Sequence, residues 1–475
     1  METGVERATT RRQWVMLAVL ALAEFMVILD ITVVNVALPD IGLDLGLDRA
    51  AATWVISAYT LAFGGLLLLG GRLADVAGRR RMFLAGLALF TVASLISGLA
   101  PSAEVLIAGR VSQGVGAALL APATLSIITT TFTGTDRHRA LGVWAAVGGS
   151  GAAVGVLVGG LLTGGPGWQW VFYINVPVGV AVALVAPALV PPGRPEHRTG
   201  RVDLPGALLA TGAMALLIYG LVQAGDDGWT STSTLVPFAA AAAGLVTFVA
   251  VERAVRRPLV RLAVLARRNV AGGFTVMLSA SALLIAAFFL SSQYLQRTLD
   301  LSPVRTGLAF LPVAVAVIVG AHVASSMVSR AGPRTVAGTG FVLAAAGFAL
   351  LAQMPADGSV LVDLLPGFVI IGGGLGATFV TATATAMTHV EDDESGLVSS
   401  LVNTGHEVGA ALGVAVMSTL AVASLGVAPT AVAPVDGFQT AFTVSAIVAG
   451  GIALASLALL PAGRLPTSDR PAFAH

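Results

Sequence analysis

Ionisable side chains interrupt several apolar segments of the chain, and they are the first candidates for chemistry. Glu24 and Asp30 share one apolar segment, Arg110 lies in a second, and His406 and Glu407 lie in a third. If these segments cross a membrane, each such group costs about 2.5–3.5 kcal/mol on insertion scales, so it is a functional candidate by default.

Asp30 and Arg110 are predicted to pair. The helical rise places Asp30 about 10 Å and Arg110 about 9 Å from the same end of their segments, so the two are level. An arginine neighbour favours the charged carboxylate. If Asp30 instead couples the protein's work to protons, it must bind and release a proton. We then expect Asp30 and Arg110 to separate during the working cycle. A permanent structural ion pair is the alternative, because buried pairs are often static.

Glu24 and Glu407 each lie about 15 Å along their helices, near the midplane where transporters bind substrate. Glu24 is six residues from Asp30, about 120° around the helix, so the two carboxyls face different ways. We predict a substrate contact at Glu24 that favours cations; a hydrogen bond to a neighbouring helix is the alternative. Glu407, with His406 beside it, is a candidate second proton or substrate site. His322 is expected to form a helix–helix hydrogen bond.

Aromatic and amide side chains in the same segments are candidates for lining a cavity, although they suit interfacial packing equally well. They are Trp54, Tyr59, Gln113 and Gln293. The acidic run at 391–394 lies in a short loop. It is predicted to be a solvated turn and not a metal site.

The composition defines the elements that must hold these groups. The chain has 475 residues, 56% of them hydrophobic and 11% charged, against roughly 25% charged in soluble domains. Apolar residues come in blocks of about twenty, enough to cross a bilayer core of ~30 Å, and they lack the alternation of barrel strands. We therefore predict an all-α membrane protein. Cysteine and lysine are absent, which excludes disulfides, thiolate metal sites and a P-loop. No cofactor and no nucleic-acid partner are expected.

Fourteen apolar segments can be counted. They fall at about 14–38, 52–70, 82–100, 104–125, 140–163, 170–191, 204–223, 233–251, 270–294, 306–328, 335–353, 360–385, 397–421 and 438–460. The first is too long for a signal peptide. With both termini in the cytoplasm, 22 arginines fall inside, three fall outside and one lies within a span. This agrees with the positive-inside rule and supports the count.

Two loops point to an internal repeat. Gly78 aligns with Gly332 and Arg80 with Arg334, at an offset of 254 residues. The offset exceeds half the chain, as expected if two extra helices separate two six-helix bundles, with a site between the halves. The predicted organisation is an N-terminal bundle at 1–201, two linker helices and a loop at 202–268, a C-terminal bundle at 269–463 and a cytoplasmic tail at 464–475.

Four stretches carry a family resemblance. They read GRLADVAGRR at 71–80, LDITVVNVALP at 29–39, RVSQGVG at 110–116 and WQWVFYINVPVG at 168–179. On these residues the chain resembles the major facilitator superfamily, and most closely its fourteen-span drug:proton antiporter branch.

The resemblance implies a role for several of these residues. It implies that Asp30 takes part in proton coupling. It also implies a conformational latch at Gly71, Asp75, Gly78, Arg79 and Arg80, although these arginines could serve only to set the topology. A protein of this branch is a monomer in the bacterial plasma membrane, and it exports small lipophilic or cationic compounds such as antibiotics by alternating access, driven by protons.

One motif departs from the pattern of the branch. The exporters carry G-x-x-x-G-P-x-x-G-G in the fifth span, and here Val156 replaces the proline between Gly151, Gly155, Gly159 and Gly160. Glycines four residues apart still let a neighbouring helix approach closely, but the proline kink is lost. An importer or facilitator of a metabolite therefore stays open as the alternative. A membrane-embedded enzyme is disfavoured, because no cluster has metal-ligand spacing and no loop is long enough for a catalytic domain.

Overall fold

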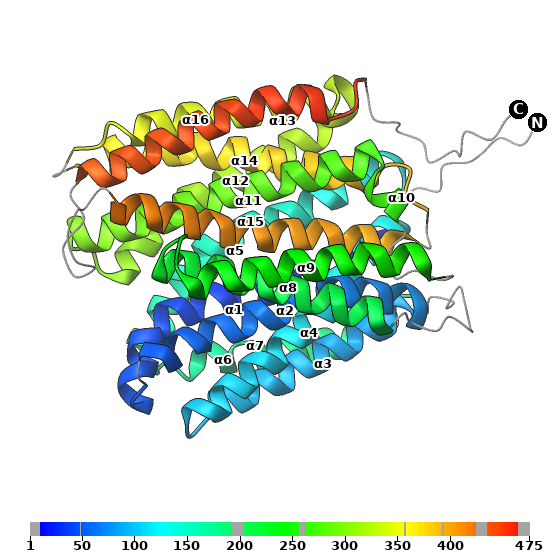
Figure 1. The fold of residues 1–475 in the computed structure, drawn as a ribbon, viewed down its shortest axis with the longest axis horizontal. Helices are drawn as coiled ribbons and strands as arrows, with labels where there is room; N and C mark the ends of the chain where they lie inside the picture. The colour runs from blue at the N-terminus through cyan, green and yellow to red at the C-terminus, as the bar shows by residue number, and fades with distance from the viewer. Residues whose placement is uncertain are drawn as a thin grey trace, which may run out of the picture.

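The computed structural model describes residues 10–47, 49–191, 204–255, 262–355, 358–391, 394–423 and 435–463, and within them the chain is helical, without strands. Long helices run roughly side by side, and the described ends of the chain lie at the same end of the bundle (Figure 1). Arg11, Arg79, Arg137, Arg268 and Arg330 lie in the first or last turns of helices there. We call this the arginine-rich end.

The first half of the described chain contains six long helices. They are α1 (Arg11–Leu45), α2 (Arg49–Ala77), α3 (Arg79–Gly98), α4 (Ala103–Thr131), α5 (Gly134–Gly164) and α7 (Asn175–Leu189), the last preceded by the single turn α6 (Trp170–Tyr173). A helical pair then follows, α8 (Leu204–Asp227) and α9 (Thr232–Ala254), with the single turn α10 (Leu262–Leu265) after it.

The second half again contains six long helices. They are α11 (Arg268–Gln293), α12 (Pro303–Ala331), α13 (Pro333–Leu351), α14 (Leu365–Ala386), α15 (Ser395–Ala423) and α16 (Val435–Leu459). Two π-helical turns adjoin this set, η1 (Tyr294–Thr298) and η2 (Val360–Leu364).

The two halves pack in the same way. Within the first half, α1 packs on α5, α2 on α4, and α3 on both α4 and α7; within the second, α11 packs on α15, α12 on α14, and α13 on both α14 and α16. The halves meet along two seams, α5 against α12 and α2 against α15. Exchanging each helix for its counterpart converts one seam into the other. The halves are therefore related by an approximate two-fold exchange.

The aligned glycines of the two loops take the same unusual conformation. Gly78 joins α2 to α3 with φ of 99°, and Gly332 joins α12 to α13 with φ of 84°. An L side chain is strained at such angles, so glycine is the residue that allows a sharp helix-to-helix turn. The glycines repeat in the sequence because both loops need the same sharp turn between two helices.

Glycines on α5 bring it close to α1. A Cβ atom at Gly151 would lie 2.4 Å from Ile28, and one at Gly155 would lie 1.7 Å from Thr32 Oγ1. Gly159 approaches Val33 of α1 in the same way, at 3.2 Å from its Cα. These residues form one stripe, as four-residue spacing requires.

The next glycine serves a different seam. Gly160 faces Val304 of α12, 3.2 Å from its side chain. Close to it, Gly307 of α12 packs on the Leu157 backbone of α5, where a Cβ atom would lie 2.7 Å from Cα. This short segment of α5 therefore contacts both its own half and the other half.

A second glycine stripe occurs on α15. Gly405, Gly409 and Gly413 face the α11 helix, where a Cβ at Gly409 would lie 2.2 Å from the Leu278 carbonyl oxygen. These three positions are the α5 glycines shifted by 254 residues, the offset of the two loops. The glycine spacing is therefore a second and longer signal of the repeat in the sequence, in addition to the two loops.

Helices α8 and α9 cover one of the two seams. Helix α8 contacts both α2 and α15, and α9 packs on α8. Trp54 of α2 stacks on Tyr219 of α8 with ring centroids 6.4 Å apart, and Trp229 Nε1, in the loop between α8 and α9, donates to Thr419 Oγ1 of α15 at 2.8 Å. The helical pair is therefore attached to both halves.

The outer faces of the helices are apolar. Leu184, Leu208, Val246 and Leu454 are each at least 65% exposed, which suits lipid and not water. Among the described residues, twelve helices are long and apolar enough to cross a membrane. The chain is therefore a polytopic, all-helical membrane protein. Helices α5 and α15 are not among these twelve, but they are 31 and 29 residues long.

We expect Gly155→Ala to destabilise the protein by about 1–3 kcal/mol, the usual penalty for overpacking. Rotating Thr32 away would not relieve the clash, because its Cβ would also lie 2.7 Å from the new methyl group. The readout is the apparent melting temperature of the purified protein in detergent. Gly450→Ala on α16 is the control, since nothing lies within 4 Å of that position. Equal melting temperatures for the two variants would contradict the close packing of α1 and α5.

Candidate functional site

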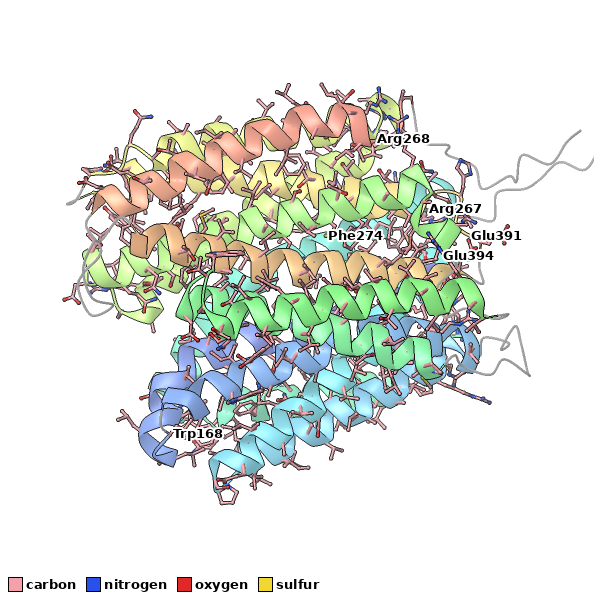
Figure 2. The ribbon with its side chains drawn as sticks, in the orientation of Figure 1. Trp168, Arg267, Arg268, Phe274, Glu391 and Glu394 are labelled. Carbon is pink, nitrogen blue, oxygen red and sulfur yellow. The ribbon has the colours of Figure 1, made fainter. Side chains whose placement is uncertain are left out.

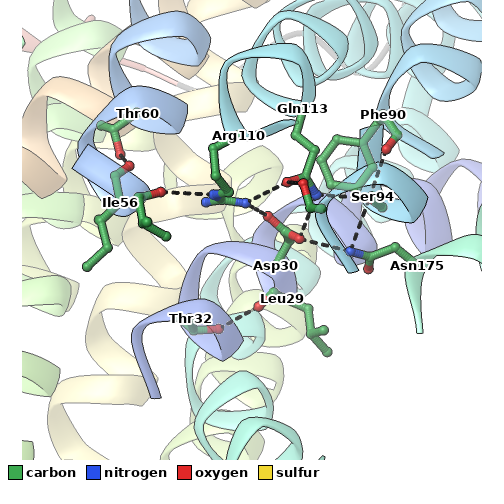
Figure 3. Close-up of polar contacts among 12 residues, drawn as sticks. Leu29, Asp30, Thr32, Ile56, Thr60, Phe90, Ser94, Arg110, Gln113 and Asn175 are labelled. Atoms are coloured by element: carbon green, nitrogen blue, oxygen red, sulfur yellow. Dashed lines mark hydrogen bonds and ion pairs between the residues drawn. The ribbon is translucent and has the colours of Figure 1, made fainter. Parts of the chain in front are cut away.

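Asp30 lies in the interior of the first half and is fully buried. Its Oδ2 pairs with Arg110 Nη1 of α4. Its Oδ1 accepts hydrogen bonds from Gln113 Nε2 at 3.0 Å and from Asn175 Nδ2 at 2.8 Å (Figure 3). The carboxylate thus has one cationic and two amide partners, which compensate for its removal from water.

Arg110 is as well satisfied as its partner. It is 1% exposed, its Nε donates to the Val55 carbonyl oxygen at 3.1 Å, and its Nη1 also donates to Gln113 Oε1 at 3.0 Å. The guanidinium carbon lies 4.3 Å from the centre of the Tyr59 ring, a cation–π distance. Side chains and backbone of α1, α2 and α4 therefore hold the buried cation from three sides.

Ser94 connects the ion pair to α3. Its hydroxyl accepts from Gln113 Nε2 at 2.8 Å and from Asn175 Nδ2 at 3.5 Å, and it donates to the Phe90 carbonyl oxygen at 2.8 Å (Figure 3). The network therefore joins α1, α2, α3, α4 and α7. Ser94 and Asn175 were not predicted from the sequence. Asn175, an amide within the stretch at 168–179, was the available signal.

Glu24 and Glu407 are two further buried carboxyl groups. Glu24 of α1 is 3% exposed and Glu407 of α15 is 9% exposed, and the two interact electrostatically. Glu407 faces α2, with its Cβ 3.9 Å from the position a Cβ would take at Gly64. His406 points elsewhere, with its ring 5.8 Å from the Phe379 ring of α14. The adjacent His406 and Glu407 therefore have different surroundings.

The remaining predicted residues divide into two groups. Tyr59 and Gln113 belong to the Asp30 network, while Trp54 stacks against α8 and is 45% exposed. Gln293 is half-buried at the end of α11. His322 is exposed on α12, so the prediction that it bonds a neighbouring helix is wrong.

At the arginine-rich end, Asp75 of the first half binds the first turn of α15 in the second half. Its Oδ1 accepts from the Gly396 amide at 2.9 Å, and its Oδ2 accepts from the Leu397 amide at 3.1 Å. The first amides of a helix have no partners within it, and the helix dipole favours an anion there. Gly71, one turn earlier, lets α2 approach, since a Cβ there would lie 2.4 Å from the Gly396 carbonyl oxygen.

The other predicted latch residues surround this contact. Arg79, in the first turn of α3, interacts electrostatically with Asp75. Gly78 provides the turn between the two helices, and Arg80 follows at the second position of α3. The five residues thus lie together at one helix junction.

Two further contacts join the halves at this end. The Ser126 hydroxyl of α4 lies 2.8 Å from the Ser395 hydroxyl at the start of α15. Arg137 Nη2 of α5 donates to the Met387 carbonyl oxygen after α14 at 2.9 Å. Together with Asp75, these contacts close the arginine-rich end between the halves.

Glu394, at the end of the acidic run, is not solvated. Its side chain is 4% exposed and pairs with Arg267, with Nη1–Oε2 at 2.6 Å and Nη2–Oε1 at 3.3 Å (Figure 2). The prediction of a solvated turn is therefore wrong at this residue. The bidentate pair anchors the start of α15 to the segment that precedes α11.

Comparison with known proteins identifies the family and the fold. The sequence model of the Major Facilitator Superfamily matches residues 20–414 and, in a second match, residues 270–474. The chain belongs to the Major Facilitator Superfamily. Two superfamily relatives are similar over almost the whole chain. The puromycin resistance protein of Streptomyces alboniger is 42% identical over 97% of this chain and 93% of its own length. The lincomycin resistance protein of Streptomyces lincolnensis is 38% identical over 97% and 94%.

The fold is also shared with solved superfamily structures. The crystal structure of a human organic anion transporter superposes with a TM-score of 0.65 at 14% identity, covering 94% of this chain and 99% of that one. At this identity the likeness extends to the fold alone. The superfamily is one of small-molecule transporters, and the named relatives are antibiotic resistance proteins.

We expect Asp30 and Arg110 to be strongly coupled in a double-mutant cycle. Asp30→Asn and Arg110→Gln should each cost about 3–5 kcal/mol, because each leaves a buried charge uncompensated, and the double variant should cost clearly less than the sum. The readout is unfolding of the purified protein in detergent. The control cycle uses Asp136 and Arg139, a partly exposed pair at 3.1 Å, where coupling should be small. Additive costs at Asp30 and Arg110 would show that the pair contributes no coupling.

Proposed function

We propose that this protein is a proton-driven exporter of small lipophilic or cationic compounds, such as antibiotics, working by alternating access. The fully buried Asp30–Arg110 pair is the observation that carries the proposal. It lies in the apolar interior of one half and is held by side chains from neighbouring helices. A static core gains little from a buried ion pair compared with apolar packing, whereas a proton-coupled transporter requires a titratable group at such a position.

The proposed topology has fourteen spans with both termini in the cytoplasm. Helices α5 and α15 are each long enough to span the membrane. Added to the twelve apolar helices, they would make fourteen spans. Both helices pack against other helices and along the seams between the halves. The arginine-rich end would then be cytoplasmic, in keeping with the positive-inside rule.

The proton step would take place at Asp30. In this structure Arg110, Gln113 and Asn175 all donate to the Asp30 carboxyl group. As the halves rock, a shift of α1 relative to α4 within the first half would separate Asp30 from Arg110 and let the carboxyl bind a proton from outside. The amides of Gln113 and Asn175 can also interact with a neutral carboxyl, so they would keep Asp30 oriented in both states.

The rocking motion would be controlled at the cytoplasmic end. Asp75 bound to the first turn of α15 stabilises closure there, together with the Ser126–Ser395 contact. Release of these bonds would open the cytoplasmic side to substrate. We further propose that the protein acts as a monomer in the bacterial plasma membrane.

Import is the second candidate function. It rests on Val156, which stands where exporters of the branch carry a proline, so α5 lacks that kink. The retained glycine stripe and the two antibiotic resistance relatives favour export.

Ethidium efflux from energised cells tests the direction and the coupling. We expect efflux that a protonophore stops and that Asp30→Asn abolishes, since asparagine cannot carry the proton. Asp436→Asn, an exposed acid at the start of α16, is the control and should keep wild-type efflux at equal membrane abundance. Efflux that continues with the protonophore, or in Asp30→Asn, would contradict proton antiport through Asp30. Proton-driven ethidium uptake would favour import.

A reversible cross-link tests the cytoplasmic closure. The natural chain has no cysteine, so Ser126→Cys with Ser395→Cys introduces the only two thiols. Their hydroxyl oxygens lie 2.8 Å apart, and a small rotation brings two sulfurs to bonding distance. Oxidation should remove both thiols from maleimide labelling and stop efflux, and reduction should restore it. Ser126→Cys alone should stay active under oxidation. A cross-linked protein with undiminished efflux would exclude separation at this contact.

A further inference from the structure

Four consecutive residues at the start of α15 contact both halves of the protein. Residues 395–397 bind Ser126 and Asp75 of the first half, over distances between 2.8 and 3.1 Å. Glu394, the residue before them, instead binds Arg267 of its own half. The contact that holds this turn within the second half is therefore adjacent in the chain to the contacts that close the arginine-rich end.

Arg267 is a well-fixed base for its contact with Glu394. The Arg267 amide donates to the Val264 carbonyl oxygen of α10 at 3.1 Å, and the Arg267 carbonyl oxygen accepts from the Ala271 amide in the first turn of α11 at 3.0 Å. Val264 is fully buried. Because the backbone is bound on both sides of the arginine, the guanidinium starts from a defined position at the beginning of α11.

The ion pair makes two parallel contacts. Arg267 Nη1 lies 2.6 Å from Glu394 Oε2, and Nη2 lies 3.3 Å from Oε1 (Figure 2). The glutamate side chain is 4% exposed and the arginine side chain 41% exposed. A two-point contact between planar groups fixes direction as well as distance. It therefore restrains the orientation of the turn that carries the amides of Gly396 and Leu397.

The internal repeat offers a comparison with the other seam. A Cβ at Gly396 of α15 would lie 2.5 Å from the Gly71 carbonyl oxygen of α2, and a Cβ at Gly142 of α5 would lie 2.9 Å from Ser325 of α12. Both members of the second contact are 254 residues from their counterparts in the first, so the two seams are equivalent here. Gly142, however, lies inside α5, which begins at Gly134, so the amides there bond within the helix.

The α5–α12 seam also carries different side chains at the equivalent positions. Asp75 corresponds to Ser329, whose hydroxyl donates within its own helix to the Ser326 carbonyl oxygen at 3.4 Å. Glu394 corresponds to Ala140, which is fully buried and cannot form an ion pair. The acid at position 394 therefore occurs at the seam where a carboxylate binds the start of a helix, and not at its counterpart.

We propose that Arg267 and Glu394 are positioning residues for the closure at the arginine-rich end, because their ion pair holds the first turn of α15 with its free amides facing Asp75. The inference rests on the proposed function, in which this closure alternates with opening. The pair lies within the second half, so it moves with that half and stays intact when Asp75 releases the turn. Each return of the halves then brings a correctly oriented turn back to Asp75.

Glu394 also has a local role from which this one must be separated. An acid at the start of a helix stabilises that helix through its dipole. The local role does not involve Arg267, so it predicts an effect of changing Glu394 alone. The positioning role predicts the same effect from either side of the pair.

The rate of disulfide formation between Ser126→Cys and Ser395→Cys, measured in membranes under mild oxidation, tests the proposal. Glu394→Gln and Arg267→Gln should each slow this cross-linking about threefold to tenfold, the usual effect of losing one hydrogen-bonded contact. The two substitutions change the charge beside the thiol at position 395 in opposite directions. An effect on thiol reactivity alone would therefore have opposite signs in the two variants.

Two further variants distinguish positioning from general support of the fold. Arg267→Lys keeps the charge but not the planar fork, so its cross-linking rate should lie between those of the natural residue and Arg267→Gln. Asp75→Asn should slow cross-linking on its own. Adding Arg267→Gln to it should slow cross-linking by less than about twofold more, because the ion pair acts through the amides that Asp75 binds.

Arg268→Gln is the matched control. Arg268 is the next residue in the chain, but it donates to the Ala458 and Leu459 carbonyl oxygens at the end of α16 (Figure 2). This variant should keep the natural cross-linking rate even where its melting temperature falls. The melting temperature of every variant, measured in detergent, identifies those that fail to fold.

Three outcomes would overturn the proposal: an unchanged rate in both glutamine variants, slowing by Glu394→Gln alone, or effects of Asp75→Asn and Arg267→Gln that multiply fully. If efflux is proton-driven but cross-linking does not depend on the pair, the proposed function stands and the positioning role is wrong. If cross-linking depends on the pair but no proton-driven efflux occurs, the positioning role stands and the proposed function is wrong.

Discussion

An arginine cannot be discharged at any pH a cell experiences, so a buried arginine obliges the protein around it to supply an anion. Arg110 imposes this constraint on the first half of the chain. Asp30 is that anion, and its second oxygen in turn needs hydrogen-bond donors from α4 and α7. The positions of α1, α4 and α7 relative to one another therefore follow in part from one positive charge. Packing alone, among glycine, alanine and leucine side chains, would allow these helices to slide with little penalty.

The contrast between the acids is as informative as the pair itself. Asp30 has all its partners within one half, so rigid-body rocking alone leaves it complete, and only a shift of helices within that half can release it. Glu24 Oε2 is buried without a hydrogen-bond partner among the described residues, and Glu407 faces α2 across the seam. A protein that must move its halves can keep full hydrogen bonding only for groups that move together.

Much of this arrangement could be predicted from the sequence, and the limits have physical causes. The Asp30–Arg110 pairing could be predicted because both residues lie a similar distance along regular helices that start from the same side. Ser94 could not be placed, since its role depends on which face α3 turns to α4. The contact of Asp75 with the Gly396 amide depends on the register between the two halves, which no local pattern specifies. Glu394 was misjudged because its burial is set by Arg267, 127 residues away.

Helices α8 and α9 lie between the two halves of the chain as a pair, and this has a topological consequence. A hairpin returns the chain to the side of the membrane that it left, so the second half keeps the same orientation as the first. A single inserted helix would have turned the second half upside down and destroyed the exchange of seams that relates α2 and α15 to α12 and α5. An insertion between duplicated units that share one orientation in the membrane is therefore constrained to even numbers of crossings. Such a hairpin can then diverge freely in sequence, provided that one of its faces continues to fit both halves.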